Sequence, residues 1–124
     1  MMLLATLEEL VDFVVAKRKG AAFRDWPYAM IATGIYQAAE SNTLAYHRDS
    51  NNKLDGIVIA RRDDLKRNIH VINILTTNPG VIELMALQFV TLFPNYTLTA
   101  YRRGKLITYD TVKIIAKILH KGVK

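Results

Sequence analysis

The sequence contains no cysteine, which excludes a disulfide framework, a thiol nucleophile and a zinc–thiolate site. Proline and glycine are also scarce, with 3 and 6 residues, too few for a collagen-like or low-complexity chain. No apolar run approaches the roughly 20 residues of a membrane-spanning helix. The stretch from 29 to 39 is interrupted by Thr33, Gly34 and Gln37, and the apolar N-terminus reaches Glu8 with no basic segment before it. We therefore expect a soluble protein with no signal peptide and no membrane contact.

The remaining composition is that of an ordinary folded domain. Hydrophobic residues make up 51% and charged residues 23% of the 124 residues, which excludes a disordered chain and provides one hydrophobic core. The 17 Lys and Arg outnumber the 11 Asp and Glu, giving a formal charge of +6. This excess favours anionic partners such as phosphates, nucleotides or acidic protein surfaces, without choosing among them.

Two helices are predicted first. Apolar residues recur at helical spacing over the first fifteen or so positions, Thr6 and Glu9 fit a capping box, and Gly20 follows a basic last turn. A second helix is expected from Asp25 as N-cap, with Pro27 in its first turn, to about Ser41–Asn42. Because this second segment is apolar on most sides, we expect it to be deeply buried.

The hydrophobic period then changes from 3.6 to 2, which predicts strands. The expected strands are 43–48, 54–61 and 69–76, with a turn at 49–52 and a charged loop at 62–68. The segment 69–76 is apolar on both faces, which is typical of a central strand covered on each side.

A helix over 81–93 follows, with Asn78 as N-cap and Pro79 at its first position. Strands 96–101 and 105–109 form a hairpin, and Asp110 begins a last helix that stops at Gly122. The order is α-α-β-β-β-α-β-β-α. It predicts one α+β domain over residues 1–124, in which helices flank a mixed, mostly antiparallel sheet.

This order resembles the GNAT-type N-acetyltransferase fold over roughly residues 3–101. The resemblance depends on element order and on the segment Val71 to Gly80 (VINILTTNPG). In that family the corresponding strand offers its backbone to the pantetheine arm of acetyl-CoA. The loop after it, with the pattern Gln/Arg-x-x-Gly-x-Gly/Ala, holds the pyrophosphate at a helix N-terminus, where free amides and the helix dipole favour an anion.

The resemblance implies a cofactor site for acetyl-CoA in this segment. Gly80 matches the first glycine of the pattern, whereas Thr77 replaces Gln or Arg, Ile82 replaces the small residue, and Pro79 removes one amide. The alternatives are weak binding, compensation by threonine hydroxyls, or a fold that has lost the cofactor; an ordinary helix cap also explains the loop. The predicted cofactor-binding residues are Ile74, Leu75, Thr76, Thr77, Asn78, Gly80 and Val81.

The resemblance also implies a tyrosine that reprotonates the leaving thiolate, and Tyr101 and Tyr109 are the candidates. Cross-strand packing of the same two rings is the structural alternative. The segment 21–27, with Phe23 and Trp26, corresponds to the acceptor side of the family, for a small amine or a protein amine; packing beneath the loop is again the alternative. The family strand that usually precedes the first helix is absent, and a hairpin stands where a helix with the catalytic tyrosine is expected.

Other polar residues have simpler explanations. Asn73 in the apolar strand is expected to bond a neighbouring strand or to mark a point where strands separate. His70 is a lone histidine, so we predict no metal site. Three basic clusters end helices or turns, and together they could bind an anionic macromolecule. These clusters are 17–19, 61–67 and 102–105.

Three functional hypotheses follow. The first is an acyltransferase-like protein that binds acetyl-CoA. The second is a non-catalytic binding or structural protein on the same scaffold, similar in overall character to small phage-encoded or virion proteins. The third is a basic nucleic-acid-associated module, supported by charge alone. A cytoplasmic location is expected, or a virion-associated one if the chain is phage-encoded.

Overall fold

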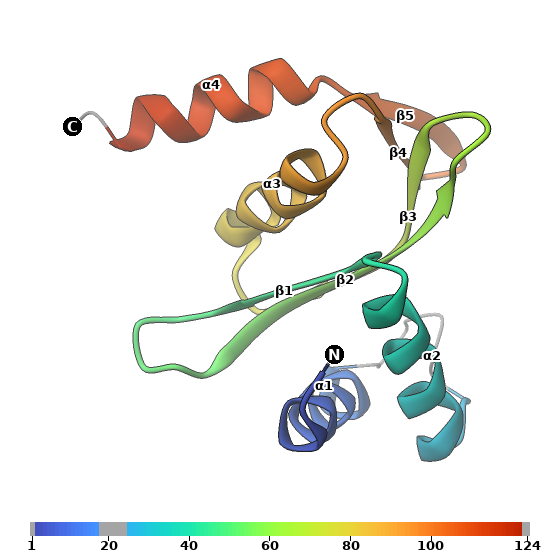
Figure 1. Ribbon diagram of the computed structural model, residues 1–124. Coiled ribbons are helices and arrows are strands. Elements are labelled where there is room, and N and C mark those ends of the chain that lie inside the picture. Colours follow the sequence, from blue (N-terminus) through green and yellow to red (C-terminus); the bar gives the residue numbers. More distant parts are fainter. Residues whose placement is uncertain (1, 18–24, 123–124) are drawn as a thin grey trace.

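The helices and strands follow the predicted order in the computed structural model, which describes residues 2–17 and 25–122 (Figure 1). Over these residues the elements are α1 (Leu4–Lys17), α2 (Tyr28–Glu40), β1 (Leu44–Arg48), β2 (Leu54–Asp63), β3 (Asn68–Thr76), the short 3₁₀ turn η1 (Pro79–Val81), α3 (Ile82–Leu92), β4 (Thr97–Arg102), β5 (Lys105–Tyr109) and α4 (Thr111–Gly122). The predicted α+β class is therefore confirmed.

The strands of the described residues form one sheet in the order β1-β2-β3-β4-β5. Neighbouring strands run antiparallel except β3 and β4, which are parallel because α3 carries the chain across between them. The sheet is thus mixed and mostly antiparallel, as predicted, with β3 at its centre.

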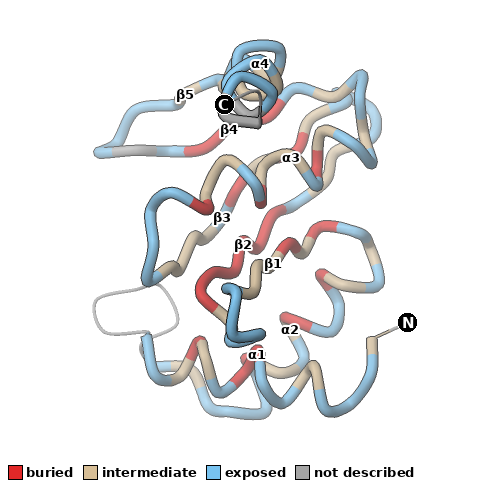
Figure 2. Tube along the Cα trace, turned by 90° about the vertical axis from the view of Figure 1, so that its left-hand side faces the viewer, coloured by how far each residue is buried: buried red, intermediate tan, exposed pale blue. Residues whose placement is uncertain are grey.

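Helices cover both faces of the sheet (Figure 1). α1 and α2 pack on one face against β1 and β2, around Leu10, Ile31, Ile35 and Ile57. α3 packs on the other face against residues from β1 to β4, with Met85 and Phe89 at the centre, and α4 contacts α3. Figure 2 shows the buried residues at the centre of the sheet and on the helix sides that face it.

The N-terminal capping box is wrong. α1 begins at Leu4, so Thr6 already lies inside the helix and cannot be its N-cap. Glu9 instead forms an ion pair with Arg48 of β1, with Nη1 and Oε2 2.7 Å apart. This bond ties α1 to the edge of the sheet and lowers the pKa of Glu9, mainly through the hydrogen bond from Arg48.

The start and the burial of α2 also differ from the prediction. Its N-cap is Pro27 rather than Asp25, because Pro27 is still extended at φ −62° and ψ 152°. Deep burial on most sides is wrong as well. Only the stripe Ile31, Ile35 and Ala38 is buried, because a sheet covers one side of a surface helix. The predicted helix stop at Gly20, the basic residues 18–19 and Phe23 lie outside the described residues.

Candidate functional site

The parallel strands β3 and β4 separate halfway along β3. Their pairing begins at Asn68 with Thr97 and ends at Val71 with Ala100, but β3 continues for five more residues to Thr76. Over these residues β3 still pairs with β2 on its other side. The second half of the central strand therefore has an edge that β4 does not cover.

A β-bulge lies where the two strands separate. On β2, Ile59 pairs with Asn73 and Ala60 with Val71, so Ile72 is an extra residue and is 52% exposed. The insertion changes the alternation of the strand, and Val71 and Ile74 consequently pack into the same core beneath α3. Because a bulge bends a strand and increases its twist, it accounts for the separation of β3 from β4.

A groove of about 850 Å³ follows this open edge. Its walls come from the second half of β3, the start of α3, the β4–β5 pair and α4, and its floor is apolar. Lysines and two acidic residues stand along it. The lining residues that matter below are Ile72, Ile74, Leu75, Thr76, Pro79, Ile82, Glu83, Ala86, Tyr101, Tyr109, Asp110, Lys113, Ile114 and Lys117.

The groove brings together residues that are distant in the sequence and that were predicted separately. Ile74, Leu75 and Thr76 of the predicted cofactor segment line it, and so do both candidate tyrosines, Tyr101 and Tyr109. The other predicted cofactor residues belong to the loop and turn beyond Thr76 and are not among the lining residues. They are Thr77, Asn78, Gly80 and Val81.

The backbone of β3 presents polar groups to this groove. The amide of Thr77 donates to the carbonyl oxygen of Asp55 at 3.0 Å. This bond shows which residues of β3 direct their backbone groups toward β2. In an antiparallel ladder the direction of the backbone groups alternates, so Leu75 also points toward β2, whereas Ile74 and Thr76 point away from it. The amide and carbonyl of Ile74 are therefore directed toward the open edge.

The loop at the start of α3 has already used its backbone amides. The Asn78 side chain accepts from the Gly80 amide at 3.0 Å, as predicted for an N-cap, and the Asn78 carbonyl accepts from Val81 at 3.1 Å. The Asn78 amide donates to Thr76 Oγ1, and the Ile82 amide donates to the Pro79 carbonyl. A phosphate at this position would meet amides that are occupied, and a proline that has none.

The two tyrosines have different surroundings. Tyr101 is 65% exposed and directly follows Ala100, the last residue of β4 that pairs with β3. Its ring packs edge-on against His70 with centroids 5.2 Å apart, and His70 Nδ1 lies 3.0 Å from Thr99 Oγ1. Tyr109 is half-buried against the core beneath α3. Tyr101 thus stands at the point of strand separation, and Tyr109 deeper along the groove.

A second hollow of about 430 Å³ lies on the opposite face of the sheet, between α2 and β2. Trp26 and Arg61 line it, as does the bulged Ile72, which also lines the groove. The two hollows therefore approach each other at the bulge. Trp26 belongs to the segment that was predicted for the acceptor side.

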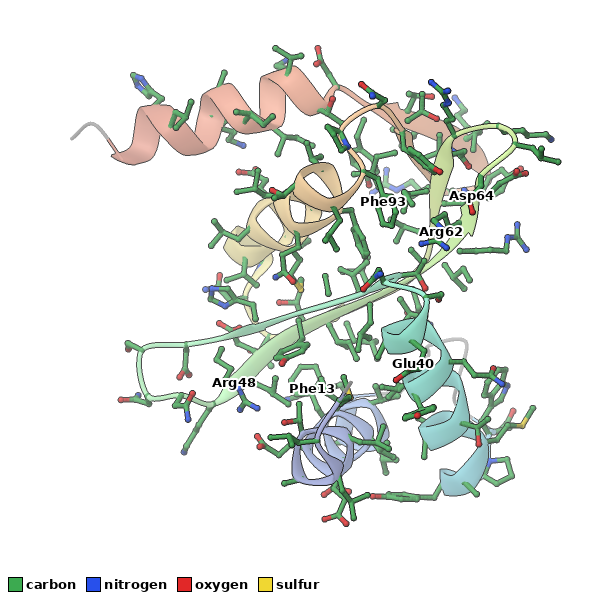
Figure 3. All side chains as sticks on the ribbon, in the orientation of Figure 1. Phe13, Glu40, Arg48, Arg62, Asp64 and Phe93 are labelled. Atoms are coloured by element: carbon green, nitrogen blue, oxygen red, sulfur yellow. The ribbon has the colours of Figure 1, made fainter. Side chains whose placement is uncertain are left out.

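Two of the basic clusters lie at opposite ends of β4. The Arg67 carbonyl accepts a hydrogen bond from the amide of Thr97, the first residue of β4, whereas Arg103 lies in the turn after its last residue, about 20 Å from Thr97 at the usual rise of a strand. Arg62 is held in place by two neighbours. Its Nε lies 2.9 Å from Asp64 Oδ1, and its Cζ lies 5.1 Å from the centroid of the Phe93 ring (Figure 3).

Across the described part of the chain, no group of three or more His, Cys, Asp or Glu could hold a metal ion.

Sequence reasoning missed several residues of the groove. Lys113 and Lys117 are spaced by four residues, which places them on one side of a helix, but the sequence did not show that this side would face β3. Sequence reasoning also missed the pair formed by His47 and the buried Asp55. The Nδ1 atom of His47 lies 2.7 Å from Oδ1 of Asp55. The Asp55 carbonyl accepts from Thr76 Oγ1 and from the Thr77 amide, so this residue fixes the end of β3.

Comparison with protein-family models, with curated proteins and with solved structures finds no match. Among the helices of residues 2–17 and 25–122, none is long and apolar enough to cross a membrane.

Proposed function

We propose that this chain binds the acyl thioester of a coenzyme A-type donor, such as acetyl-CoA, in the groove and transfers the acyl group to an amine. The observation that carries the proposal is the strand separation at Val71 and Ala100, which places Ile74 to Thr76 and both tyrosines around one groove. The volume of about 850 Å³ is in the range that small-molecule sites occupy.

The donor would lie along the open edge of β3. A pantetheine arm carries amide groups, which pair with backbone groups as a neighbouring strand would, and Ile74 directs its amide and carbonyl there. The Ile74 carbonyl would accept from a pantetheine amide, which leaves the Ile74 amide to polarise the thioester carbonyl. The backbone of Leu75 points toward β2 and would not take this role.

The acceptor amine would enter from the hollow on the opposite face. Its lone pair attacks the thioester carbon, a C–N bond forms, and the C–S bond breaks as the intermediate collapses. The leaving thiolate takes the phenolic proton of Tyr101, and the proton released by the new amide passes to solvent, from which Tyr101 is reprotonated. Tyr101 is preferred over Tyr109 because it lies at the strand separation, near the bulge where the two hollows approach.

Isothermal titration with acetyl-CoA tests binding. The parent chain is expected to bind with a micromolar Kd, about −8 kcal/mol. Ala86→Trp, which fills the groove from α3, is expected to abolish the heat, whereas Leu84→Trp, on the exposed side of the same helix, keeps it. No heat at millimolar acetyl-CoA, or equal binding by the two variants, would refute the proposed site.

Transfer is tested separately, by mass spectrometry of amine acceptors. Tyr101→Phe is expected to lower the turnover about 100-fold with little change in acetyl-CoA binding, and Tyr109→Phe to change turnover much less. A Tyr101→Phe variant with parental turnover would remove this residue from the mechanism.

The second candidate is a non-catalytic binding or structural protein on the same scaffold, which has lost the cofactor. The occupied amides of the Thr77–Ile82 loop favour it, because a family-type phosphate cradle is closed in this conformation. No binding of acetyl-CoA, and no product over a panel of amines, would favour this candidate over the first.

A further inference from the structure

α4 brings both lysines and apolar side chains to the groove. Lys113 and Lys117 lie four residues apart, on one side of the helix, and both line the groove. Val112 and Leu119 are instead 74% and 65% exposed. Ile114, between the two lysines in the sequence, is half-buried and lines the groove as well, so the exposed lysines border an apolar wall there.

Lys117 brings positive charge to the start of α3. Lys117 Nζ lies 2.6 Å from Glu83 Oε1, in the first turn of α3, so this ammonium stands close to the loop at residues 77–82. The Lys113 ammonium makes no hydrogen bond or ion pair within the part of the chain that the structure describes. Its charge is therefore available to a ligand in the groove.

The loop itself offers no comparable charge or donor. Its amides from Thr77 to Ile82 bond within the loop or to Asp55, and Pro79 has no amide. An anionic group at this end of the groove would therefore be bound by side chains. Lysine suits this task, because its flexible ammonium carries three donors and a full charge.

We propose that Lys113 and Lys117 bind the phosphate groups of the donor, in place of the backbone amides of the Thr77–Ile82 loop. The proposal rests on the proposed function, since it assigns the phosphates of the same donor. The ligand class is a thioester of phosphorylated pantetheine. The phosphate can come from the nucleotide of coenzyme A or from a phosphopantetheine group such as a carrier protein bears.

The test compares three donors that share the acetyl thioester but differ in phosphate: acetyl-CoA, S-acetyl-4′-phosphopantetheine and S-acetylpantetheine. Each is titrated calorimetrically into the parent chain, into Lys113→Gln/Lys117→Gln, and into the matched control Lys53→Gln/Lys66→Gln, whose lysines lie in exposed turns outside the groove. Far-UV circular dichroism checks that each variant folds. Lys113→Gln alone keeps the Lys117–Glu83 ion pair intact and serves as the second variant.

The parent chain is expected to prefer acetyl-CoA to S-acetylpantetheine by about tenfold or more. The groove double variant loses this preference and binds both alike, Lys113→Gln loses part of it, and the control variant keeps it. Added salt should reduce the preference of the parent, because the contacts are exposed charges. S-acetyl-4′-phosphopantetheine identifies the phosphate that is bound. If the parent chain prefers it to S-acetylpantetheine as strongly as it prefers acetyl-CoA, the lysines bind the pantetheine phosphate. If this preference is smaller, they bind phosphates of the nucleotide.

Three results would overturn the inference, and they differ in what else they refute. If the double variant keeps the parental preference for acetyl-CoA, the phosphates are bound elsewhere, although the groove site stands. If the parent chain binds S-acetylpantetheine and acetyl-CoA equally, no phosphate site exists. If it binds none of the three donors, the proposed function itself is wrong and this inference fails with it.

Discussion

Replacing the N-cap Asn78 by alanine tests the account of the loop most simply. The Asn78 side chain makes one capping bond, to the Gly80 amide at 3.0 Å, whereas the bonds made by its backbone survive the substitution. Loss of an asparagine N-cap costs about 1 kcal/mol, which lowers the Tm of a domain of this size by about 4 °C. Thermal and denaturant unfolding monitored by circular dichroism measure both quantities.

The substitution also has a functional consequence. Asn78→Ala releases the Gly80 amide, so a donor phosphate that gains access to it should bind equally well or more tightly, despite the lower stability. Asn95→Ala is the matched control, because Asn95 lies in a turn and its side chain makes no hydrogen bond within the described residues. If Asn78→Ala unfolds like the parent chain and like Asn95→Ala, the cap contributes nothing and the reasoning on the occupied amides is refuted.

Three further substitutions test the packing, a turn and an ion pair. Met85→Ala, at a side chain with 0% exposure beneath the sheet, is expected to lower the free energy of unfolding by about 2–5 kcal/mol in urea titration. A loss below about 1 kcal/mol would contradict its place in the core. Arg103→Asn is expected to raise that free energy by about 0.5–1 kcal/mol, because Arg103 and Gly104 adopt φ values of 52° and 78°, which favour Asn-Gly in a two-residue hairpin. A destabilised variant would show that the Arg103 side chain has a role of its own. Glu9→Gln should be less stable than the parent at neutral pH. The parent's advantage is lost as the pH falls from the ordinary value of 4.5 through the lowered pKa of Glu9, so an advantage that persists at lower pH would exclude the Arg48 bond as its cause.

Local patterns predicted the elements well. The alternation of apolar residues identified the strands. Asn78 and Pro79 begin a helical segment as predicted, but Asn78 caps the 3₁₀ turn η1, and α3 itself begins at Ile82 with Val81 as its N-cap. The capping box at Thr6 failed because a four-residue motif is common and the first turn of α1 begins earlier. The burial of α2 was overestimated because its apolar content does not reveal that a neighbour covers one side alone.

The groove depends on contacts between distant residues, which no local pattern contains. The pairing of β3 with β4 ends at Val71 because of the bulge at Ile72, and nothing in an apolar run such as VINIL marks an extra residue. Three of the predicted cofactor-binding residues, Ile74 to Thr76, and both tyrosines line the groove, and these were chosen from the sequence through the resemblance in element order. The lysines of α4 were not, because the sequence does not show which side of α4 lies against the groove.

The most direct test of the central claim is the methyl spectrum of isoleucine-labelled protein during titration with acetyl-CoA. Ile74, Ile82 and Ile114 line the groove, whereas Ile31 and Ile35 pack between α2 and the other face of the sheet. Binding between the separated strands predicts shifts of the first three methyl signals, with those of Ile31 and Ile35 nearly unchanged. Unchanged spectra at millimolar acetyl-CoA, or shifts confined to Ile31 and Ile35, would contradict the claim.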